Sequence, residues 1–509
     1  MVYNAAKQRT ASQDALGFFT TYVYDTSGRP NATQDALGNR TTTIYDARDA
    51  IASQDALGNR STQTFDAIGR RTASTSPLGF INTTVYDSAN QVTAQIDPLG
   101  NRTTMTYNVN GALVSNQDAL NHVSTTSYQS TSNRVASRTD AKGFVSSIVY
   151  DVAGQNIATQ DARGNFISNT YDNAGRRKTI QNEIGKIATT TFDADGRAIN
   201  LLDANGWSKT MVYDAANRQT LTQYGDGTFV TFVYDTVNNR TKMQDSGGTT
   251  TYAYTVRNEL STVTYPSADV IAYQYNAVGA RSLMIEPAGG RFTYTYDTLN
   301  RLKTQSNSKN RVYTCAYDAD SRMTTLSMGF GRTKVQTFDA VGRVTQEVEL
   351  NSASAPIMTI VDTYDAAGRK TKQVRDANPT TYTYDEINRL TGQQKAGAFA
   401  TFTMDSIGNV LTKWHQGGQP ITMTYDAASR ITTIQDGPTM VTQTYDPNGN
   451  MTLENRGGVL STYTYDRENR LKVLNDVGAL STMTYAGDGL RLATGVDGKF
   501  LWHSATERC

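Results

Sequence analysis

The stretch Tyr24-Asp25-Thr26-Ser27-Gly28-Arg29 recurs, with variations, along almost the whole chain of 509 residues. Its anchor position occurs 24 times between Tyr3 and Tyr485, at a spacing of about 21 residues, and is aromatic in every copy except that at Met404. Tyr occupies 20 of these anchors, and Asp follows the anchor in 18 copies. Repetition at a fixed period of this length indicates a repeat array rather than several unrelated domains.

A second signal lies half a period from the first. The segments Asp14-Ala15-Leu16-Gly17 and Asp97-Pro98-Leu99-Gly100 show the same Asp-x-x-Gly pattern that follows the anchor. Asp at the first turn position can accept hydrogen bonds from the backbone ahead, and Gly or Asn at the fourth tolerates the left-handed conformation. We therefore expect a type I turn closed by a bulge twice per repeat: a Y-D turn after each anchor, and a half-repeat turn midway between anchors.

The runs between these turns predict β-strands. Residues 40–45 and 210–213 are rich in β-branched and aromatic side chains, and pairs such as Tyr22 and Tyr24 mark one face at a period of two. No long apolar stripe at a helical period occurs in the sequence. The sequence thus predicts an all-β fold, a repetitive antiparallel meander of about 45 to 48 strands with two per repeat. Because a single exposed sheet layer is poorly stable, the meander should curl into a spiral β-shell or a solenoid-like ribbon.

The composition argues against several classes of protein. The 48 basic residues balance 47 acidic ones, so nothing points to binding of nucleic acid. Two Cys and three His argue against a disulfide scaffold and against a His/Cys metal centre. No stretch approaches 18 consecutive apolar residues, and residues 1–14 contain no apolar signal core, which predicts no membrane span and no signal peptide in this chain.

Two irregularities interrupt the repeat. The interval from Phe338 to Tyr364 is longer than the others, and the extra residues predict an insertion loop near 351–358. The half-repeat signal is strong up to about residue 215 and then blurs, which indicates either a change in curvature or sequence drift.

The pattern Y-D-x-x-G-R at 24–29, 65–70, 171–176 and 364–369 resembles the YD repeat of RHS-repeat proteins. That family includes bacterial rearrangement-hotspot proteins, wall-associated proteins, toxin-complex cocoon subunits and animal teneurins. Asp-Pro-Leu-Gly-Asn-Arg at 97–102 and Gly-Asp-Gly-Leu-Arg at 487–491 are also typical of it. The resemblance covers residues 1–495, which we expect to form one array of about 24 repeats, followed by a non-repeat tail at 496–509.

The resemblance implies a spiralling β-sheet shell, which in the toxin members encloses a C-terminal cargo. It also implies a secreted or cell-surface bacterial protein whose partners are a C-terminal toxin or effector domain, or neighbouring shell segments. The family's autocleavage motif has no counterpart after Tyr485. We therefore expect a fragment that lacks the C-terminal core and the toxin domain. From the strand spacing, such a segment alone could cup only a small cargo.

The sequence predicts no catalytic, cofactor-binding or metal-binding residues, and hence no enzyme and no cofactor. His122, His415 and His503 stand alone, and Cys315 and Cys509 have a low expectation of pairing. The segments 193–196 and 446–450 superficially resemble calcium loops but lack the Glu at position twelve, and 329–331 lacks the spacing of a phosphate loop. All are interpreted as turn or strand residues.

The residues that define the repeat are structural in this interpretation. Aromatic rows can also stack on sugars, so a cell-surface adhesion or carbohydrate-binding module is the alternative; Tyr side chains that pack the sheet and reach a turn are favoured over it. The repeat-defining residues are Tyr24, Asp25, Gly28, Arg29, Tyr45, Asp46, Phe65, Asp66, Gly69, Arg70, Tyr171, Asp172, Gly175, Arg176, Phe192, Asp193, Gly196, Arg197, Tyr364, Asp365, Gly368 and Arg369.

Overall fold

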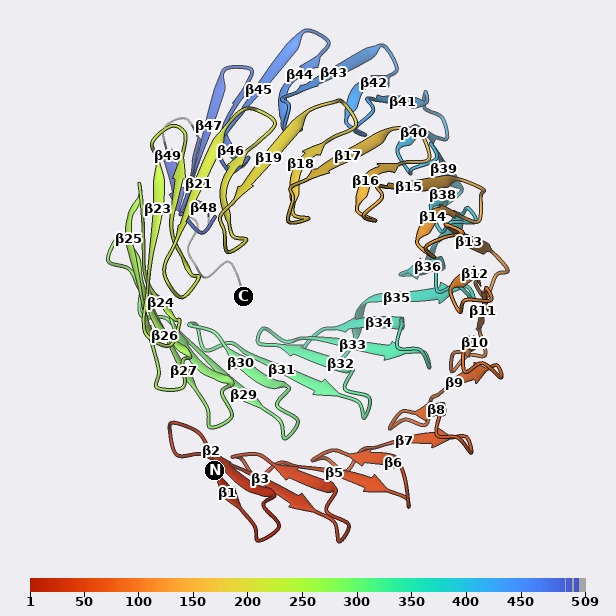
Figure 1. Cartoon of the computed structure of the whole chain (residues 1–509), viewed down its shortest axis with the longest axis vertical. Coiled ribbons are helices and arrows are strands. Elements are labelled where there is room, and N and C mark those ends of the chain that lie inside the picture. The colour runs from red at the N-terminus through yellow and green to blue at the C-terminus, as the bar shows by residue number, and fades with distance from the viewer. Residues whose placement is uncertain (490, 497–498, 503–509) are drawn as a thin grey trace. The chain divides into compact units, whose positions relative to one another are not determined.

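The computed structural model describes residues 1–489, 491–496 and 499–502 and confirms the all-β prediction. The described residues form strands β1 to β49 and no helix, so none of them belongs to a helix that could cross a membrane. Consecutive strands pair antiparallel, as β3 with β4 and β45 with β46. Figure 1 shows successive hairpins following one another along the chain.

The chain divides into two compact units, and each contains two ribbons of strands. In unit 1, Met1–Val123 form the early ribbon, and Tyr252–Thr264 with Ala268–Thr381 form the late ribbon. The early ribbon contains β1 (Val2–Tyr3), β2 (Arg9–Gln13), β3 (Phe19–Tyr24), β4 (Pro30–Gln34), β5 (Arg40–Tyr45), β6 (Ala50–Gln54), β7 (Arg60–Phe65), β8 (Arg71–Thr75), β9 (Ile81–Tyr86), β10 (Val92–Ile96), β11 (Arg102–Tyr107) and β12 (Leu113–Gln117). The late ribbon contains β26 (Leu260–Thr264), β27 (Val270–Tyr275), β28 (Arg281–Ile285), β29 (Arg291–Tyr296), β30 (Leu302–Ser306), β31 (Val312–Tyr317), β32 (Met323–Met328), β33 (Arg332–Phe338), β34 (Val344–Leu350), β35 (Pro356–Tyr364) and β36 (Lys370–Arg375).

In unit 2, Ser124–Thr251 form the early ribbon, and the described residues from Tyr382 onward form the late ribbon. The early ribbon contains β14 (Val135–Thr139), β15 (Val145–Tyr150), β16 (Asn156–Gln160), β17 (Phe166–Tyr171), β18 (Arg177–Gln181), β19 (Ile187–Phe192), β20 (Ala198–Leu202), β21 (Ser208–Tyr213), β22 (Gln219–Tyr224), β23 (Phe229–Tyr234) and β24 (Arg240–Asp245). The late ribbon contains β38 (Leu390–Lys395), β39 (Ala398–Met404), β40 (Val410–His415), β41 (Ile421–Tyr425), β42 (Ile431–Asp436), β43 (Thr439–Tyr445), β44 (Met451–Arg456), β45 (Val459–Tyr465), β46 (Leu471–Asp476), β47 (Ala479–Tyr485), β48 (Arg491–Val496) and β49 (Lys499–Trp502). The unit boundaries fall within β13 (Val123–Tyr128), β25 (Gly248–Tyr254) and β37 (Asn378–Tyr384).

The four-residue turns have the geometry that their sequence predicts. In the turn that starts at Asp25, the N–H of Gly28 donates to the Asp25 carbonyl at 3.0 Å, and the N–H of Asp25 donates to the Arg29 carbonyl at 2.9 Å. Gly28 has a φ of 80°, which is the left-handed conformation that closes the bulge. The half-repeat turn at Asp14 repeats both bonds, with Gly17 at a φ of 90°. Both turns of the repeat are therefore the same structure.

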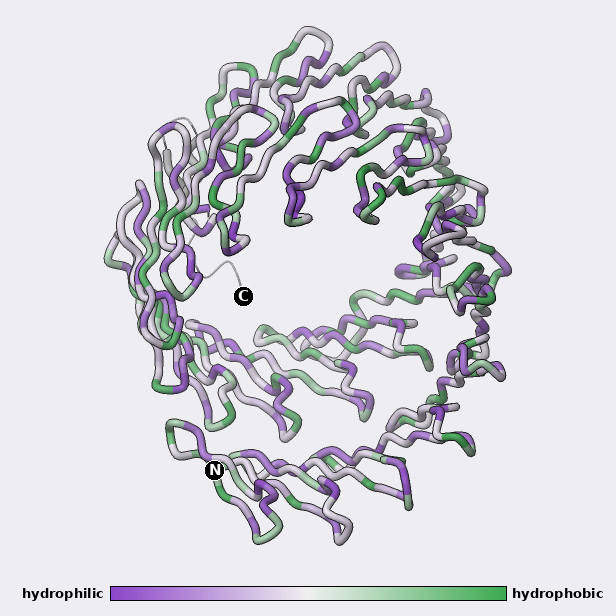
Figure 2. Tube along the Cα trace, viewed as in Figure 1, coloured by the Kyte–Doolittle hydropathy of each residue, from purple (hydrophilic) through white to green (hydrophobic). Residues whose placement is uncertain are grey.

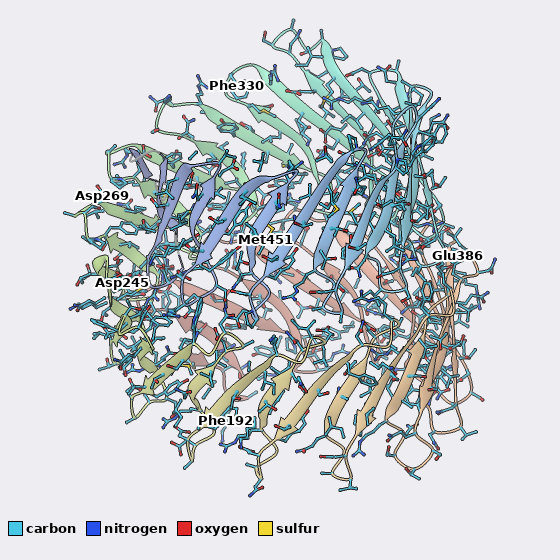
Figure 3. The ribbon with its side chains drawn as sticks, turned by 90° about the horizontal axis from the view of Figure 1, so that it is seen from above. Phe192, Asp245, Asp269, Phe330, Glu386 and Met451 are labelled. Carbon is cyan, nitrogen blue, oxygen red and sulfur yellow. The ribbon has the colours of Figure 1, made fainter. Side chains whose placement is uncertain are left out.

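Each ribbon is one sheet layer with little buried interior. The accessible surface is 27931 Å², about 1.5 times the roughly 18,000 Å² expected for a compact chain of this mass. The buried apolar side chains include Val230, Ile271 and Val441, which each lie four residues before an anchor and hence on the face of that anchor. Figure 2 shows polar and apolar residues alternating along the trace, and Figure 3 shows side chains on both faces of the strands. The strands are thus held largely by contacts along the ribbon.

Two features differ from the predictions. The extra residues near 351–358 do not form an irregular loop, because they lengthen strands: β34 has 7 residues and β35 has 9, joined by a four-residue turn from Asn351 to Ser354. A longer hairpin satisfies its backbone groups by strand pairing, which a protruding loop would leave to water. The predicted tail begins inside β48, and β49 pairs with that strand; 503–509 lie outside the described residues.

Candidate functional site

The Asp of the repeat holds its own turn together. Asp25 Oδ1 accepts the N–H groups of Ser27 and Arg29, both at 2.9 Å, and Asp25 Oδ2 accepts from Arg29 Nε at 2.7 Å. The backbone N–H of Arg29, then its side chain, lower the pKa of this carboxyl below the ordinary 3.8. Asp172 and Asp214 have lowered pKa values for the same first cause, the N–H of the Arg four residues later. The carboxylate is therefore part of the turn.

The Arg of the repeat joins one Y-D turn to the next. Besides its bonds to Asp25, the Arg29 guanidinium donates from Nη1 to the Asp46 carbonyl at 2.9 Å and stacks 4.3 Å from the centre of the Tyr45 ring. The same link, to the turn one repeat later, recurs along both ribbons of both units. It is made by Arg70, Arg176, Arg218, Arg301, Arg322, Arg343, Arg389 and Arg430.

The Tyr of the repeat binds backward along the ribbon. The Tyr24 hydroxyl donates to the Arg9 carbonyl at 2.9 Å, and the Tyr45 hydroxyl donates to the Pro30 carbonyl at 2.8 Å, each 15 residues earlier. Burial raises the pKa of Tyr296 and Tyr425, which make the equivalent bond. Phe65 and Phe192 lack the hydroxyl and keep only the ring. In the copies that have both residues, Tyr and Arg together tie a repeat to both of its neighbours.

The predicted repeat-defining residues therefore lie in rows, and their motif bonds run within one turn or to the neighbouring repeat. Arg29 meets Tyr45 and Asp46, and Arg176 meets Phe192 and Asp193. The copies at 24–29, 171–176 and 364–369 are brought to no common pocket. The motif residues therefore serve to connect neighbouring repeats of the ribbon.

A second contact zone joins the two ribbons of each unit. Half-repeat turns of the early ribbon contact Y-D turns of the late ribbon that follow 241 to 245 residues later, as Ser76 contacts Asp320 and Asn205 contacts Asp446. We call this contact line the seam. It is lined by cavities of about 400 to 680 Å³, the largest of which borders Phe80, Asp320 and Arg322 in unit 1.

The sequence analysis missed the residues of the seam. Lys142 lies 3.4 Å from Asp385, Arg163 lies 3.7 Å from Asp405, and Arg257 donates to Asp14 at 3.2 Å. The signal that could have found Lys142, Arg163 and Asp320 is a charged residue at the third position of a turn, where Leu, Ile, Val or Ala usually stands.

The isolated candidates for chemistry lie in structural positions. His122 bonds its own turn residue Asp118 at 3.0 Å, and His415 ends β40. Cys315 lies on β31 and is a free thiol; His503 and Cys509 lie outside the described residues. The calcium-like segments at 193–196 and 446–450 are four-residue turns, and 329–331 is the turn between β32 and β33. The described residues contain no cluster of three or more His, Cys, Asp or Glu side chains suited to a metal.

Known proteins carry the same repeat and the same fold. Residues 163–352 match the family described as teneurin YD-shell, and residues 86–120 match the RHS repeat. No curated protein sequence gives a significant match. Among solved structures, the TcdB2–TccC3–Cdc42 complex aligns with a TM-score of 0.61 at 13% identity over 94% of this chain. A Photorhabdus luminescens Tc holotoxin pore aligns with a TM-score of 0.61 at 14% identity over 95% of this chain.

A TcdB2–TccC3 structure aligns with a TM-score of 0.58 at 14% identity over 97% of this chain. The chain spans 31% of the length of the first two solved chains and 38% of the third. At this identity the structures establish a shared fold. The repeat, the geometry of its turns and the two family matches show that the chain contains repeats of the YD/RHS type.

Proposed function

We propose that the chain is a non-enzymatic wall segment of a β-shell that encloses or presents a C-terminal toxin or effector domain in a bacterial RHS-type protein. The observation that carries this proposal is the use of the motif: Tyr, Asp, Gly and Arg of each repeat bond the neighbouring repeat or their own turn. A surface built from such links is continuous, and continuity is what a wall requires. The fold shared with the Tc toxin structures supports it.

The charged side chains of the repeat are consistent with a structural role. Catalytic carboxylates are usually set apart by environments that move their pKa values toward the working pH. Here the carboxyls of Asp25, Asp66 and Asp172 have lowered pKa values because they accept hydrogen bonds from their own turns. Such groups stay ionised at neutral pH and act as hydrogen-bond acceptors.

The adhesion or glycan-binding alternative depends on aromatic faces that are open to a ligand. The anchor rings described here face the guanidinium of the preceding repeat, at 4.3 Å for Tyr45 and 4.7 Å for Tyr86. Their hydroxyls are bonded to backbone carbonyls. The geometry therefore favours the shell over a row of sugar platforms.

The proposal implies an extracellular or cell-surface location and a covalently attached cargo as partner. A test is to append the same short, Lys- and Arg-rich unstructured peptide either after Cys509 or before Met1, and to digest both fusions with trypsin under native conditions. We expect slower cleavage of the C-terminal peptide than of the N-terminal one, and no selective binding of the unmodified chain on a glycan array. Equal cleavage rates would refute enclosure, and selective binding to one glycan class would favour adhesion.

A further inference from the structure

Across the seam, the third residue of a four-residue turn lies opposite the first residue of the facing turn. In most seam turns the third residue is apolar, as in Leu16 or Val278. Nine third residues of seam turns are charged or carry an amide, and seven of them contact the first residue of the facing turn. The other two, Asp226 and Asp488, instead pair with Arg467 and Arg240. The seven pairs, with the third residue named first, are Lys142 with Asp385, Arg163 with Asp405, Asn205 with Asp446, Arg257 with Asp14, Asn448 with Asp203, Asp320 with Ser76 and Glu468 with Tyr224.

The chemistry of these pairs is complementary in both directions. Where the first residue is Asp, the third residue that meets it is a cation or an amide: Asn448 Nδ2 donates to Asp203 at 2.7 Å, and Asn205 Nδ2 donates to Asp446 at 2.9 Å. Where the first residue carries a hydroxyl, the third residue is an acid. Hydrogen bonds to a carboxylate are the stronger class, so each pair has a clear preference for its own partner.

Asp320 supplies to the Ser76 turn the carboxylate that this turn lacks. In the turn at Asp14, Oδ1 accepts the N–H groups of the third and fifth residues, both at 2.9 Å. In the turn at Ser76, the third N–H, that of Leu78, instead donates to Asp320 Oδ1 at 3.1 Å, while Ser76 Oγ donates to Asp320 Oδ2 at 2.9 Å. The carboxylate of Asp320, 244 residues later in the chain, thus accepts the turn hydrogen bond that a first-position Asp would accept.

Glu468 makes the equivalent contact in unit 2. The Tyr224 hydroxyl donates to Glu468 Oε1 at 2.5 Å, and Lys209 Nζ donates to the same carboxylate at 3.0 Å. Burial, followed by the bond to Glu468, raises the pKa of Tyr224, so the phenol remains a donor. Each unit therefore has one acid at a third position of its late ribbon that meets a hydroxyl at a first position of its early ribbon.

We propose that Asp320 and Glu468 are register keys, residues that determine which turn of the late ribbon docks on which turn of the early ribbon. The turns of a repeat array are near copies, so backbone geometry alone does not distinguish one alignment from the next. A slip by one repeat places Asp320 opposite Asp55 or Asp97, and places Glu468 opposite Asp203 or Asp245. Each slip brings two carboxylates together, whereas the observed register brings a carboxylate to a hydroxyl.

The register key at Asp320 needs no cargo, so a double-mutant cycle on Ser76→Asp and Asp320→Lys tests it in the intact chain. Asp is the usual first residue of these turns, so Ser76→Asp should stabilise a turn that acts alone. The register key predicts the opposite sign: amide exchange at Leu78 should become about tenfold faster, since the loss of a charge-assisted bond is worth about one such factor. Adding Asp320→Lys should restore protection, because the pair then matches Asp385 with Lys142.

Two further variants keep the test decisive. Asp320→Asn preserves the shape of the side chain and should also protect Leu78 when combined with Ser76→Asp. Asp195→Lys is the matched control, because Asp195 is an acid at a third position of an early Y-D turn and pairs with Arg197 of its own turn at 3.2 Å. We expect no change at Leu78 from it. Slower exchange in Ser76→Asp alone, or strictly additive effects in the cycle, would overturn the proposal.

Discussion

The half-repeat turns of the early ribbons and those at the C-terminal end of the late ribbons follow different designs. Early turns such as Asp14–Gly17 and Asp203–Gly206 have four residues and a carboxylate at the first position. From β36 onward, turns such as Ala396-Gly397 and Val477-Gly478 have two residues, both at positive φ. The early turns form the seam, whereas in the described part of the chain these late turns bond only the same or the adjacent hairpin of their own ribbon.

From β36 onward, this difference gives the weaker half-repeat signal a physical cause. A four-residue turn with Asp at its first position offers a carboxylate and a third side chain to a facing ribbon. A two-residue turn is the most economical connection for a hairpin whose edge meets no other turn. From β36 onward the shorter turns therefore coincide with the absence of seam contacts among the described residues, and the predictions below test the comparison from the largest effect to the smallest.

The largest effect is expected from Gly79→Val, compared with Gly69→Val. Both glycines have left-handed φ values, 86° and 89°, so Val should cost about 1–2 kcal/mol in either turn. A Cβ at Gly79 meets nothing within 4 Å, whereas one at Gly69 meets Arg48 at 3.4 Å, so crowding alone ranks Gly69 as the worse site. We predict the reverse order of urea midpoints, because the Gly79 turn carries the seam contact to Asp320.

The same variants test whether damage stays local. In a repeat array each unit contacts mainly its neighbours, so chymotrypsin should cut near the altered turn of Gly69→Val and leave long fragments, as read by mass spectrometry. Gly196→Val, in an equivalent turn at a φ of 85°, should behave alike. Collapse of either variant into small peptides would show one cooperative core instead.

A smaller effect is expected from Arg→Lys substitutions in a Y-D turn at the seam and in one away from it. Arg322 bonds Asp318 and the Asp339 carbonyl and also lies 5.5 Å from the Phe80 ring across the seam, while Arg70 makes the equivalent bonds along one ribbon. Lys keeps the charge but loses the planar, multiple donors. Arg70→Lys should cost about 1 kcal/mol and Arg322→Lys more, by urea unfolding. Equal losses of unfolding free energy in the two variants would show that the seam contact of Arg322 adds no stability.

Acid should weaken the four-residue turns that have an Asp carboxylate at their first position. The pKa values of Asp25, Asp66 and Asp172 lie below the ordinary 3.8 in the folded chain. A lowered pKa contributes stability that is present above 3.8 and is lost as the pH falls through the folded value. Amide exchange in four-residue turns should therefore be unchanged from pH 7 to 5 after correction for intrinsic rates, and should accelerate below 3.8. Loss of protection already at pH 5 would contradict this assignment.

The smallest effect concerns a strained two-residue turn. Val477 has a φ of 50°, and a β-branched residue tolerates the left-handed region poorly. Val477→Asn should therefore stabilise its hairpin by about 0.5–1 kcal/mol, seen as a higher urea midpoint. The same change at Val459, the first residue of β45, is the control and should be neutral or unfavourable.

Most of the fold could be predicted because each repeat encodes it locally. The anchor spacing, the Asp that accepts turn N–H groups and the Gly at positive φ suffice for the meander. The seam could not be predicted, since nothing local to Ser76 indicates that its carboxylate comes from Asp320. The longer hairpin of β34 and β35 was also missed, because extra residues in a repeat give no sign of whether they pair or protrude.

The central claim, that the half-repeat turns of the early ribbon dock in one register on the late ribbon, has a direct test. Cysteines introduced as Asn205→Cys and Asn448→Cys, with Cys315→Ser and Cys509→Ser, occupy positions where the Asn205 N–H donates to Asn448 Oδ1 at 3.2 Å. A short bifunctional thiol reagent should cross-link this pair efficiently and should link Asn205→Cys with Glu468→Cys, one repeat away, far less. Equal cross-linking of both pairs, or of neither, would contradict the account.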